Sequence, residues 1–519
     1  MNEREVEERL RSDVSLAVVE AAAGSGKTYQ GAALAREVAS RGRGRVLILT
    51  HTNAACDVFA SRTQGCGAID IRTIDSLVVE LATAYRVALS LPEDVTFWAL
   101  TTPGAYDRLR KSVALLLERF PPAAAAVAER YPVVICDEHQ DADEPQHAIV
   151  MALHAAGSRV RVFGDPLQGI YGGRRGDRAA ASGRWRELCA AADWAGVLDR
   201  PHRWINAHSR ELGEWVCDAR RRLKAREPID LRNARPRGLE VFYADNVALG
   251  RRGGIAFDSA ASHRIRRLLT DSNEMLVLAS NNATVDGICS FMGHRVPIWE
   301  GHVRRHLGML ASRCREHRGD AVAIAEATVA FTSATDEDAG GGTVMTGFSP
   351  SQFGNRLVEE VQAGCTRPCR AGTRPARLQE LGRCLLAQPD HRGVAALLER
   401  LEALVREDVG VRELHIDLRR EYWEAIRLGE FEDPVIALAE VSRARSARRG
   451  ALAGKAVSTI HKAKGLEVAN VMVLPCDASH FGDTDNARCK LYVAISRATR
   501  RLVLVLSRRS ATRLIVSGE

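Results

Sequence analysis

The sequence contains no apolar run of the roughly 18 residues that a membrane-spanning helix needs, which disfavours a membrane protein. Its first residues, MNEREVEERLRSD, are charged throughout and do not predict a secretory signal. Twelve cysteines are scattered without a CxxC pair, and only Cys365 and Cys369 stand four apart, so neither a disulfide scaffold nor a zinc finger is expected. Together these absences predict a cytoplasmic protein with reduced thiols.

Neither sign of charge dominates the composition. Lys and Arg number 73, Asp and Glu number 65, and the net charge is +8, with 27% charged and 46% hydrophobic residues. This is the composition of a folded globular protein. The modest positive excess permits a polyanionic partner without establishing one, because only a clustered excess creates a binding field. A length of 519 residues predicts roughly three to four domains.

Short apolar segments alternate with helical ones in two parts of the chain. The predicted strands lie at 16–20, 45–50, 69–73, 133–136 and 160–163, and then at 239–243, 275–279, 456–460, 471–474 and 502–506. Continuous apolar strands joined by helices indicate parallel sheets covered on both faces, which is an α/β fold. The stretches 84–130 and 308–454 are predicted to be mainly helical.

The segment Gly24-Ser25-Gly26-Lys27-Thr28 lies between the first predicted strand and the first long helix. Glycines there allow backbone N–H groups to close around phosphate oxygens, and the following helix directs its positive end at them. Lys27 would reach the β- and γ-phosphates, and the Thr28 hydroxyl would bind Mg²⁺. The alternative is a glycine turn before a surface helix. The lysine, the hydroxyl and the strand–helix setting together favour the phosphate loop.

A second apolar strand ends in the pair Asp137-Glu138. Ligands of parallel sheets bind at the carboxyl ends of the strands, so both acids are expected to face the phosphate loop. Asp137 is then the candidate Mg²⁺ ligand, and Glu138 the candidate base that activates water. Without the upstream loop, such a pair would be interpreted as a solvated loop.

Four further segments resemble the motifs of UvrD/Rep-like superfamily 1 helicases. They are DEHQDAD at 137–143, GDPLQGIY at 164–171, TIHKAKGLE at 459–467 and LYVAISRA at 491–498. Their order and spacing run the length of the chain. The resemblance implies two RecA-like motor domains: 1A at 1–83 and 131–198, and 2A at 199–307 and 455–519. It also implies reduced inserted domains 1B at 84–130 and 2B at 308–454, with ATP bound between 1A and 2A.

The resemblance also assigns roles around the nucleotide. It implies that Gln168 senses the γ-phosphate and that Arg203 and Arg497 stabilise the transferring phosphoryl group. For Arg203 the alternative is a surface arginine in a basic region. Gly465 and Glu467 of the TIHKAKGLE segment would lie beside the ribose or the attacking water.

The nucleobase site departs from the family pattern. The family has a glutamine upstream of the phosphate loop, but the first 29 residues contain none. Where relatives stack adenine between an arginine and a tyrosine, this chain offers Tyr29 and His202. The preference for ATP over other nucleotides therefore stays open.

The resemblance places single-stranded DNA across both motor domains. The candidate contacts are His51, Thr52, Asn53, Thr73, Tyr171 and His461. His51 replaces a family phenylalanine, and Gly173 replaces a tryptophan, so base stacking is weakened. Arg174 and Arg175 are candidates for compensating phosphate contacts. The basic stretches 220–226 and 443–449 are equally consistent with solvated surfaces.

Two functions remain from these patterns. The first is an ATP-dependent DNA helicase or single-stranded DNA translocase, with 3′-to-5′ polarity by resemblance, acting in anti-phage defence or DNA repair. The chain ends soon after the last motif, so cleavage is expected from a partner. Short relatives resemble the helicase subunit of the Gabija anti-phage system, which implies an OLD-like TOPRIM nuclease. The second is a DNA- or nucleotide-sensing ATPase that regulates a nuclease without processive unwinding. The choice of DNA or RNA and the oligomeric state stay open.

Overall fold

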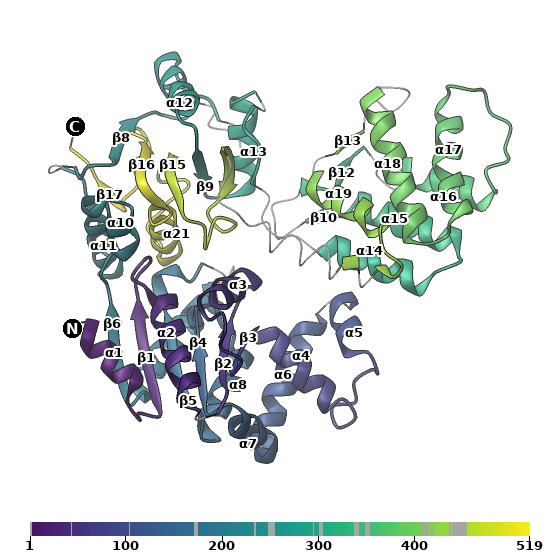
Figure 1. The fold of residues 1–519 in the computed structure, drawn as a ribbon. Helices are drawn as coiled ribbons and strands as arrows, with labels where there is room; N and C mark the ends of the chain where they lie inside the picture. Colours follow the sequence, from purple (N-terminus) through teal and green to yellow (C-terminus); the bar gives the residue numbers. More distant parts are fainter. Residues whose placement is uncertain are drawn as a thin grey trace. The chain divides into compact units, whose positions relative to one another are not determined.

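The computed structural model describes residues 3–42, 44–102, 104–170, 175–232, 235–247, 255–293, 295–299, 305–336, 342–347, 353–407, 414–416, 419–434, 437–438 and 454–518. It divides into two compact units, drawn with the rest of the chain in Figure 1. The first unit comprises Met1–Leu91, Tyr106–Trp299 and Gly450–Glu519, and the second comprises Pro92–Ala105 and Glu300–Arg449.

The first sheet of the first unit is parallel, with strand order β3-β2-β4-β5-β1-β6. Its strands are β1 Leu16–Ala21, β2 Val46–Thr50, β3 Ile69–Thr73, β4 Val133–Cys136, β5 Arg159–Gly164 and β6 Trp194–Leu198. Strand β1 pairs with β5 and with the edge strand β6, so that Ala17 lies between Arg161 and Trp194. The central strands are buried throughout, as expected for a sheet covered on both faces. The sequence analysis did not predict the edge strand β6, whose residues Trp-Ala-Gly-Val-Leu are mostly apolar but of which only two are buried.

Helices cover this sheet. They are α1 Glu3–Arg11, α2 Lys27–Ser40, α3 Asn53–Arg62, α4 Ile74–Ala84, α6 Ala105–Arg119, α7 Pro121–Arg130, α8 Glu144–Ala155 and α9 Arg175–Ala191. One face packs its strands against α1, α2 and α3 through Val6, Leu34 and Phe59, each nearly inaccessible to solvent. The alanine-rich helix α2 places small side chains such as Ala32 and Ala35 against the strands, which lets the helix pack closely on the sheet.

The second sheet of this unit is also parallel, with order β14-β9-β15-β16-β8. Its strands are β8 Leu239–Tyr243, β9 Met275–Ala279, β14 Lys455–Thr459, β15 Val468–Cys476 and β16 Ala498–Leu506. The neighbouring helices are α10 His202–Asn206, α11 Arg210–Lys224, α12 Ser259–Asp271, α13 Asn282–Phe291 and α21 Asp485–Ile495. The short strands β7 Ile229–Asp230 and β17 Ile515–Val516 form a separate parallel pair. Two parallel sheets with helices confirm the predicted α/β fold class.

A shared apolar core joins the two sheets. Trp204 of α10 is fully buried and lies in the same cluster as Leu167 and Ile170 from the first sheet and Tyr492 from α21. The Trp204 indole N–H donates to the Ala498 carbonyl oxygen at 2.7 Å, which satisfies the one polar atom of this side chain. The carboxyl ends of β1, β4 and β5 are therefore held close to the loop that follows β14.

The second unit is mainly helical. It contains α5 Val95–Thr101, α14 Arg305–Glu316, α15 Ala321–Thr332, α16 Asn355–Gln362, α17 Arg374–Ala387, α18 His391–Glu407 and α19 Arg419–Leu428. Two short antiparallel pairs accompany them, β10 Thr335–Asp336 with β11 Gly342–Thr343, and β12 Met345–Thr346 with β13 His415–Ile416. Its own core gathers Leu357, Leu381, Leu397 and Tyr422. The division of the chain into 1A, 1B, 2A and 2B stays a prediction.

Within the part of the chain that the structure describes, no helix has both the length and the apolarity to cross a membrane. All twelve cysteines carry free thiols.

Candidate functional site

The loop between β1 and α2 has the backbone of a phosphate cradle. Gly24 and Gly26 have φ values of 69° and 89°, in the left-handed region that favours glycine. A Cβ at Gly24 would lie 2.7 Å from Cβ of Arg203 and 2.9 Å from the Trp204 ring, so no other residue fits there. The Ser25 hydroxyl is buried and has no hydrogen-bond partner. A cradle that excludes side chains and leaves a buried polar atom unpaired fits a bound nucleotide phosphate.

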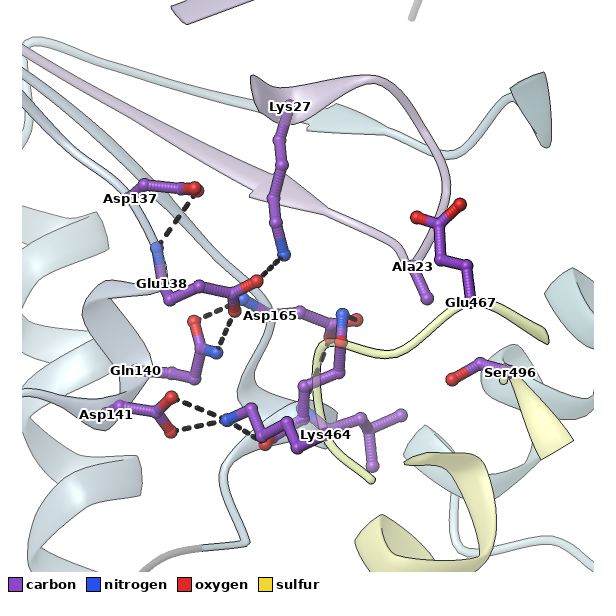
Figure 2. A network of polar contacts seen from close by, with 12 residues as sticks. Ala23, Lys27, Asp137, Glu138, Gln140, Asp141, Asp165, Lys464, Glu467 and Ser496 are labelled. Atoms are coloured by element: carbon purple, nitrogen blue, oxygen red, sulfur yellow. Dashed lines mark hydrogen bonds and ion pairs between the residues drawn. The ribbon is translucent and has the colours of Figure 1, made fainter. Parts of the chain in front are cut away.

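Lys27 begins α2 and its Nζ forms an ion pair with Oε1 of Glu138, as Figure 2 shows. Burial alone would lower the pKa of Lys27, but the charges of Glu138 and Asp137 outweigh that effect and raise it. Burial likewise disfavours an ionised Glu138, yet Lys27 and Lys464 together lower its pKa. Both groups are therefore charged, and Lys27 neutralises the candidate base.

Asp137 lies beside this pair in a different electrostatic state. Burial, which outweighs the opposing charge of Lys27, raises the pKa of Asp137 to about 6, and Glu138 adds to the rise. The nearby Thr28 hydroxyl acts in the opposite direction and moderates this rise in the pKa of Asp137. A hydroxyl beside a buried carboxylate is the oxygen donor set that Mg²⁺ takes when phosphate oxygens and water complete its shell. The pair predicted for Mg²⁺ is thus brought together and fits that ion.

Gln140 connects the candidate base to the end of the neighbouring strand. Its Nε2 donates to Oε2 of Glu138 at 2.5 Å, and its Oε1 accepts from the Asp165 backbone N–H at 2.9 Å. Glu138 itself has a φ of 54°, which is unusual for a residue with a side chain and costs free energy. The amide of Gln140 therefore fixes the direction of a carboxylate on a strained backbone (Figure 2).

Arg497 reaches this edge of the first sheet from the second. Its side chain is 2% exposed, and Nη2 donates to Oγ of Ser496 at 2.7 Å and to Oε1 of Gln168 at 3.4 Å. Burial and the nearby Arg203 lower the pKa of Arg497 to about 10, and it stays charged near neutral pH. Gln168 and Arg497, distant in sequence, are therefore in contact.

Arg203 touches the phosphate loop directly. Its backbone N–H donates to the Gly24 carbonyl at 3.1 Å, and its guanidinium donates to the Ser496 carbonyl at 2.7 Å and to Oε1 of Glu467 at 2.6 Å. Burial opposes ionisation of Glu467, but Arg203 prevails and lowers its pKa. The Arg203 Nε is buried without a partner, which leaves one donor for an oxygen of a ligand. The surface interpretation of Arg203 is wrong, because its side chain is 11% exposed.

A second ion pair joins the two sheets through Lys464. Its Nζ lies 2.7 and 2.5 Å from the two oxygens of Asp141 and 2.7 Å from the Gln168 carbonyl oxygen. Both side chains are 8% exposed. In Figure 2 the loop that carries Lys464 and Glu467 crosses beside the Glu138–Gln140 pair. The Tyr492 hydroxyl adds a further link by accepting from the Ala23 N–H at 2.8 Å.

The residues predicted at the nucleobase lie near the loop but differ in exposure. Tyr29 is 63% exposed. His202 has its Cδ2 3.6 Å from where a Cβ of Gly26 would stand, and its Nε2 lies 2.6 Å from Oε1 of Glu3. Gly465 has a φ of 86° and open space around it. Glu3 on α1, which contacts His202, was not predicted from the sequence as a site residue.

The predicted DNA contacts are only partly described. The hydroxyls of Thr52 and Thr73 accept from the N–H groups of Ala55 and Ser76 and thereby cap α3 and α4. His51 is half-buried, and burial lowers its pKa.

His461 lies 3.2 Å from the Ile170 carbonyl oxygen through Nε2. Tyr171, Gly173 and Arg174 lie outside the described residues, and the side chains of Asn53 and Arg175 are not described.

Sequence analysis missed several residues that hold the site together: Gln140, Asp141, Asp165, Arg220, Lys464 and Tyr492. All except Arg220 lie inside the four motif-like segments, which was the available signal. Arg220 was grouped with a basic surface stretch, and the structure corrects this, since it is 5% exposed.

Two family models match the chain. An AAA domain matches residues 3–219, and a UvrD-like helicase C-terminal domain matches residues 455–505. The first matched segment contains the phosphate loop, and the second contains Lys464. The two matches support a UvrD-like helicase.

A curated protein matches a short stretch of the chain, and a solved structure aligns over most of it. An 83-residue stretch is 37% identical to the RecBCD enzyme subunit RecB of Mycolicibacterium smegmatis, which covers 15% of this chain and only 8% of RecB. The crystal structure of Pif1 helicase from Candida albicans aligns over 97% of this chain and 94% of its own, at 12% identity and a TM-score of 0.35. At that TM-score the alignment supports no conclusion. The domain matches agree with the predicted ATP-hydrolysing helicase, and the roles of individual residues stay predictions.

Proposed function

We propose that this chain is an ATP-driven DNA helicase or translocase that moves along single-stranded DNA. The observation that carries the proposal is the meeting of groups from both parallel sheets at one phosphate loop. Lys27 and Glu138 come from the first sheet, and Arg203 and Arg497 come from the elements around the second. A site divided between two sheets favours a motor, because nucleotide binding and release change how the two halves are held.

Lys27 and Glu138 exchange partners in the proposed cycle. Lys27 neutralises Glu138 in the structure. The γ-phosphate of ATP competes for the lysine, because an ammonium group binds the more highly charged partner more strongly. Glu138, released from Lys27 and still oriented by Gln140, accepts the proton of the attacking water. Arg203 and Arg497 offer guanidinium donors to the phosphoryl group, and Gln168, which contacts Arg497, is proposed to sense the γ-phosphate.

Thr28 and Asp137 are the residues that would hold Mg²⁺ in this proposal. The ion supplies charge neutralisation on the phosphate oxygens when it is bound. Asp137 must lose its proton to serve as a ligand, and its raised pKa makes that loss dependent on pH. Tyr29, His202, Gly465 and Glu467 surround the remaining part of the nucleotide, with ATP as the expected substrate.

The direction and biological setting extend this proposal further. By resemblance we infer 3′-to-5′ movement, with His51, Thr52, Asn53, Thr73, Tyr171 and His461 along the strand. RecB is named as a subunit of the RecBCD enzyme. We infer that this chain likewise works with a partner protein, an OLD-like TOPRIM nuclease as in the Gabija system, in anti-phage defence or DNA repair.

A second candidate is a DNA- or nucleotide-sensing ATPase that regulates such a nuclease. The observation that favours it is the use of Thr52 and Thr73 as helix caps, which leaves less of each hydroxyl for the strand. A capping hydroxyl accepts from the helix and keeps only its own proton to donate. Weak contacts of this kind suit binding without processive unwinding.

Two measurements separate these functions. ATP turnover is measured with and without single-stranded DNA, and displacement of a labelled strand is measured on duplexes with a 3′ or a 5′ tail. Lys27→Ala serves as the inactive control. Stimulated turnover with unwinding from the 3′ tail supports the helicase. Turnover that no nucleic acid stimulates would remove the motor, and robust unwinding by the chain alone would remove the regulatory alternative.

A further inference from the structure

Arg220 on α11 differs from the arginines beside it. The Arg221 and Arg222 side chains are 72% and 37% exposed and pair with Asp218 on the same helix. The Arg220 side chain is 6% exposed and faces the carboxyl edge of the first sheet. A buried guanidinium is costly unless charged partners surround it, so its contacts indicate what it does.

The guanidinium of Arg220 joins the ends of two parallel strands. Nη2 lies 2.8 Å from Oδ1 of Asp165, just after β5, and 2.7 Å from Oε1 of Glu20, in β1 before the phosphate loop. Nε lies 3.3 Å from both oxygens of Asp165. The Asp165 side chain is inaccessible to solvent, so its charge depends on this arginine.

Asp165, held by Arg220, in turn fixes the orientation of the Gln168 side chain. Its Oδ2 accepts from Nε2 of Gln168 at 2.9 Å, while Oε1 of Gln168 accepts from Arg497. Only one orientation of the amide satisfies both neighbours, because a carboxylate needs a donor and a guanidinium needs an acceptor. The contact with Asp165 therefore decides which end of the Gln168 amide faces Arg497.

We propose that Arg220 is a positioning residue for ATP hydrolysis: it fixes the Asp165 carboxylate, which orients the Gln168 amide toward Arg497. The inference rests on the proposed function, since it deepens the same site. Arg220 touches neither the phosphate loop glycines nor Lys27 in the contacts described, and it acts through Asp165. Lysine is a poor replacement, because one ammonium group lacks the planar fork by which Nε and Nη2 together contact the Asp165 carboxylate.

The test is a double-mutant cycle on ATP turnover. The variants are Arg220→Lys, Gln168→Ala and the double variant, with Arg222→Lys as the matched control on the same helix. We expect R220K to lower kcat about tenfold or more, with KM for ATP changed less than about threefold, because a misplaced group costs turnover more than binding. We expect R222K to match the wild type.

The cycle separates positioning from general stability. If Arg220 acts through Gln168, R220K has no further effect on kcat once Gln168 is alanine. Fold-losses that multiply in the double variant would overturn the proposal, because a merely stabilising ion pair acts independently of Gln168. A wild-type chain without ATPase activity would overturn the proposed function as well, whereas multiplying losses in an active chain overturn this inference alone.

A second variant covers the case in which R220K fails to fold. Asp165→Asn keeps the shape of the side chain and needs no guanidinium partner. Carried through the same cycle, D165N is expected to lower kcat alone and to add nothing in the Gln168→Ala background. Independent losses from D165N and Q168A would contradict the path from Arg220 through Asp165 to Gln168.

Discussion

At the scale of single residues, the site is a set of charges that neutralise one another. Lys27 pairs with Glu138, Lys464 with Asp141, and Arg203 with Glu467. In each pair, at least one residue is proposed to contact the nucleotide or to hold another residue that contacts it. Opposite charges at these distances stabilise each other, most strongly where both side chains are nearly buried, as in the Lys464–Asp141 pair. A ligand phosphate then has to displace carboxylates rather than water.

Glu138→Gln tests the base directly. We expect kcat for ATP to fall by about 10²–10⁴-fold, since the amide cannot accept the proton of water. Nucleotide affinity should be retained, because Lys27 loses a competing carboxylate. Steady-state turnover and calorimetric nucleotide binding measure the two effects. Glu144→Gln, an exposed change on α8, is the control, and an E138Q variant with normal turnover would refute the assignment.

At the scale of elements, helix ends and strand ends set where each group stands. Asp143 caps α8 in a reciprocal arrangement with Gln146, directly after the DEHQ segment. Thr52 and Thr73 cap α3 and α4 after β2 and β3. Each of these caps stands at or shortly after the end of a strand, so the helices begin along the carboxyl edge of the first sheet, where ligands of parallel sheets bind.

Thr73→Ala tests the capping role. We expect the free energy of unfolding to fall by about 1 kcal/mol without any DNA, because the Ser76 N–H loses its acceptor. Thr73→Ser keeps a hydroxyl that can accept this bond, so its free energy of unfolding should stay near the wild-type value. Thr83→Ala, which removes a hydroxyl bonded to the Val79 carbonyl within the same helix, is the matched control and should not destabilise. Chemical denaturation gives all four values, and an unchanged stability of T73A would contradict the cap.

His139 and His147 link the DEHQDAD segment to α8 and predict a pH dependence. Their rings lie 3.0 Å apart, Nε2 to Nδ1. Burial, with the charge of the other ring for His139 and of Arg184 for both, lowers both pKa values. Below the unfolded pKa near 6.5, these histidines bind protons in the unfolded chain but not in the folded one. The free energy of unfolding therefore falls as the pH falls.

We therefore expect the thermal midpoint to drop between pH 7 and pH 5. One such histidine contributes at most about 1.4 kcal/mol per pH unit. His139→Asn should flatten this dependence, whereas His263→Asn on the exposed surface of α12 should leave it unchanged. Scanning calorimetry over this range measures the slopes, and equal slopes for wild type and H139N would refute the prediction.

At the scale of the first unit, two sheets distant in sequence are held together by one core and a few ion pairs. Trp204 supplies the apolar part, and the Lys464–Asp141 pair supplies a polar link between the loop after β14 and the segment after β4. Both side chains of the pair are nearly buried, so removing one leaves an unpaired charge.

Lys464→Met is expected to destabilise the fold by about 3 kcal/mol for that reason. Adding Asp141→Asn should recover part of the loss, and a coupling energy of about 0.5–3 kcal/mol would result. Lys455→Met on β14, where the lysine bonds only to the Thr270 carbonyl in the contacts described, is the control. Urea unfolding followed by tryptophan fluorescence measures the four variants, and strict additivity would contradict a direct link.

The sequence by itself determined the α/β class, the phosphate loop and the carboxylates at the end of β4. These follow from local patterns, because glycine positions, apolar strands and the residues that succeed them are fixed within a few neighbours along the chain. The resemblance, rather than the spacing, predicted that Arg203 and Arg497 lie at the nucleotide; the structure brings Arg203 to Gly24 of the loop and Arg497 to Gln168.

Only the tertiary structure decided which charges meet. Arg220 lies in a run of arginines, and nothing local distinguishes it from Arg221; burial against Asp165 and Glu20 does. The Lys464–Asp141 pair was likewise not predicted, because the two residues lie 323 positions apart in the sequence. The physical reason is that a charge is paired or solvated according to what the fold packs around it, and that depends on residues hundreds of positions away.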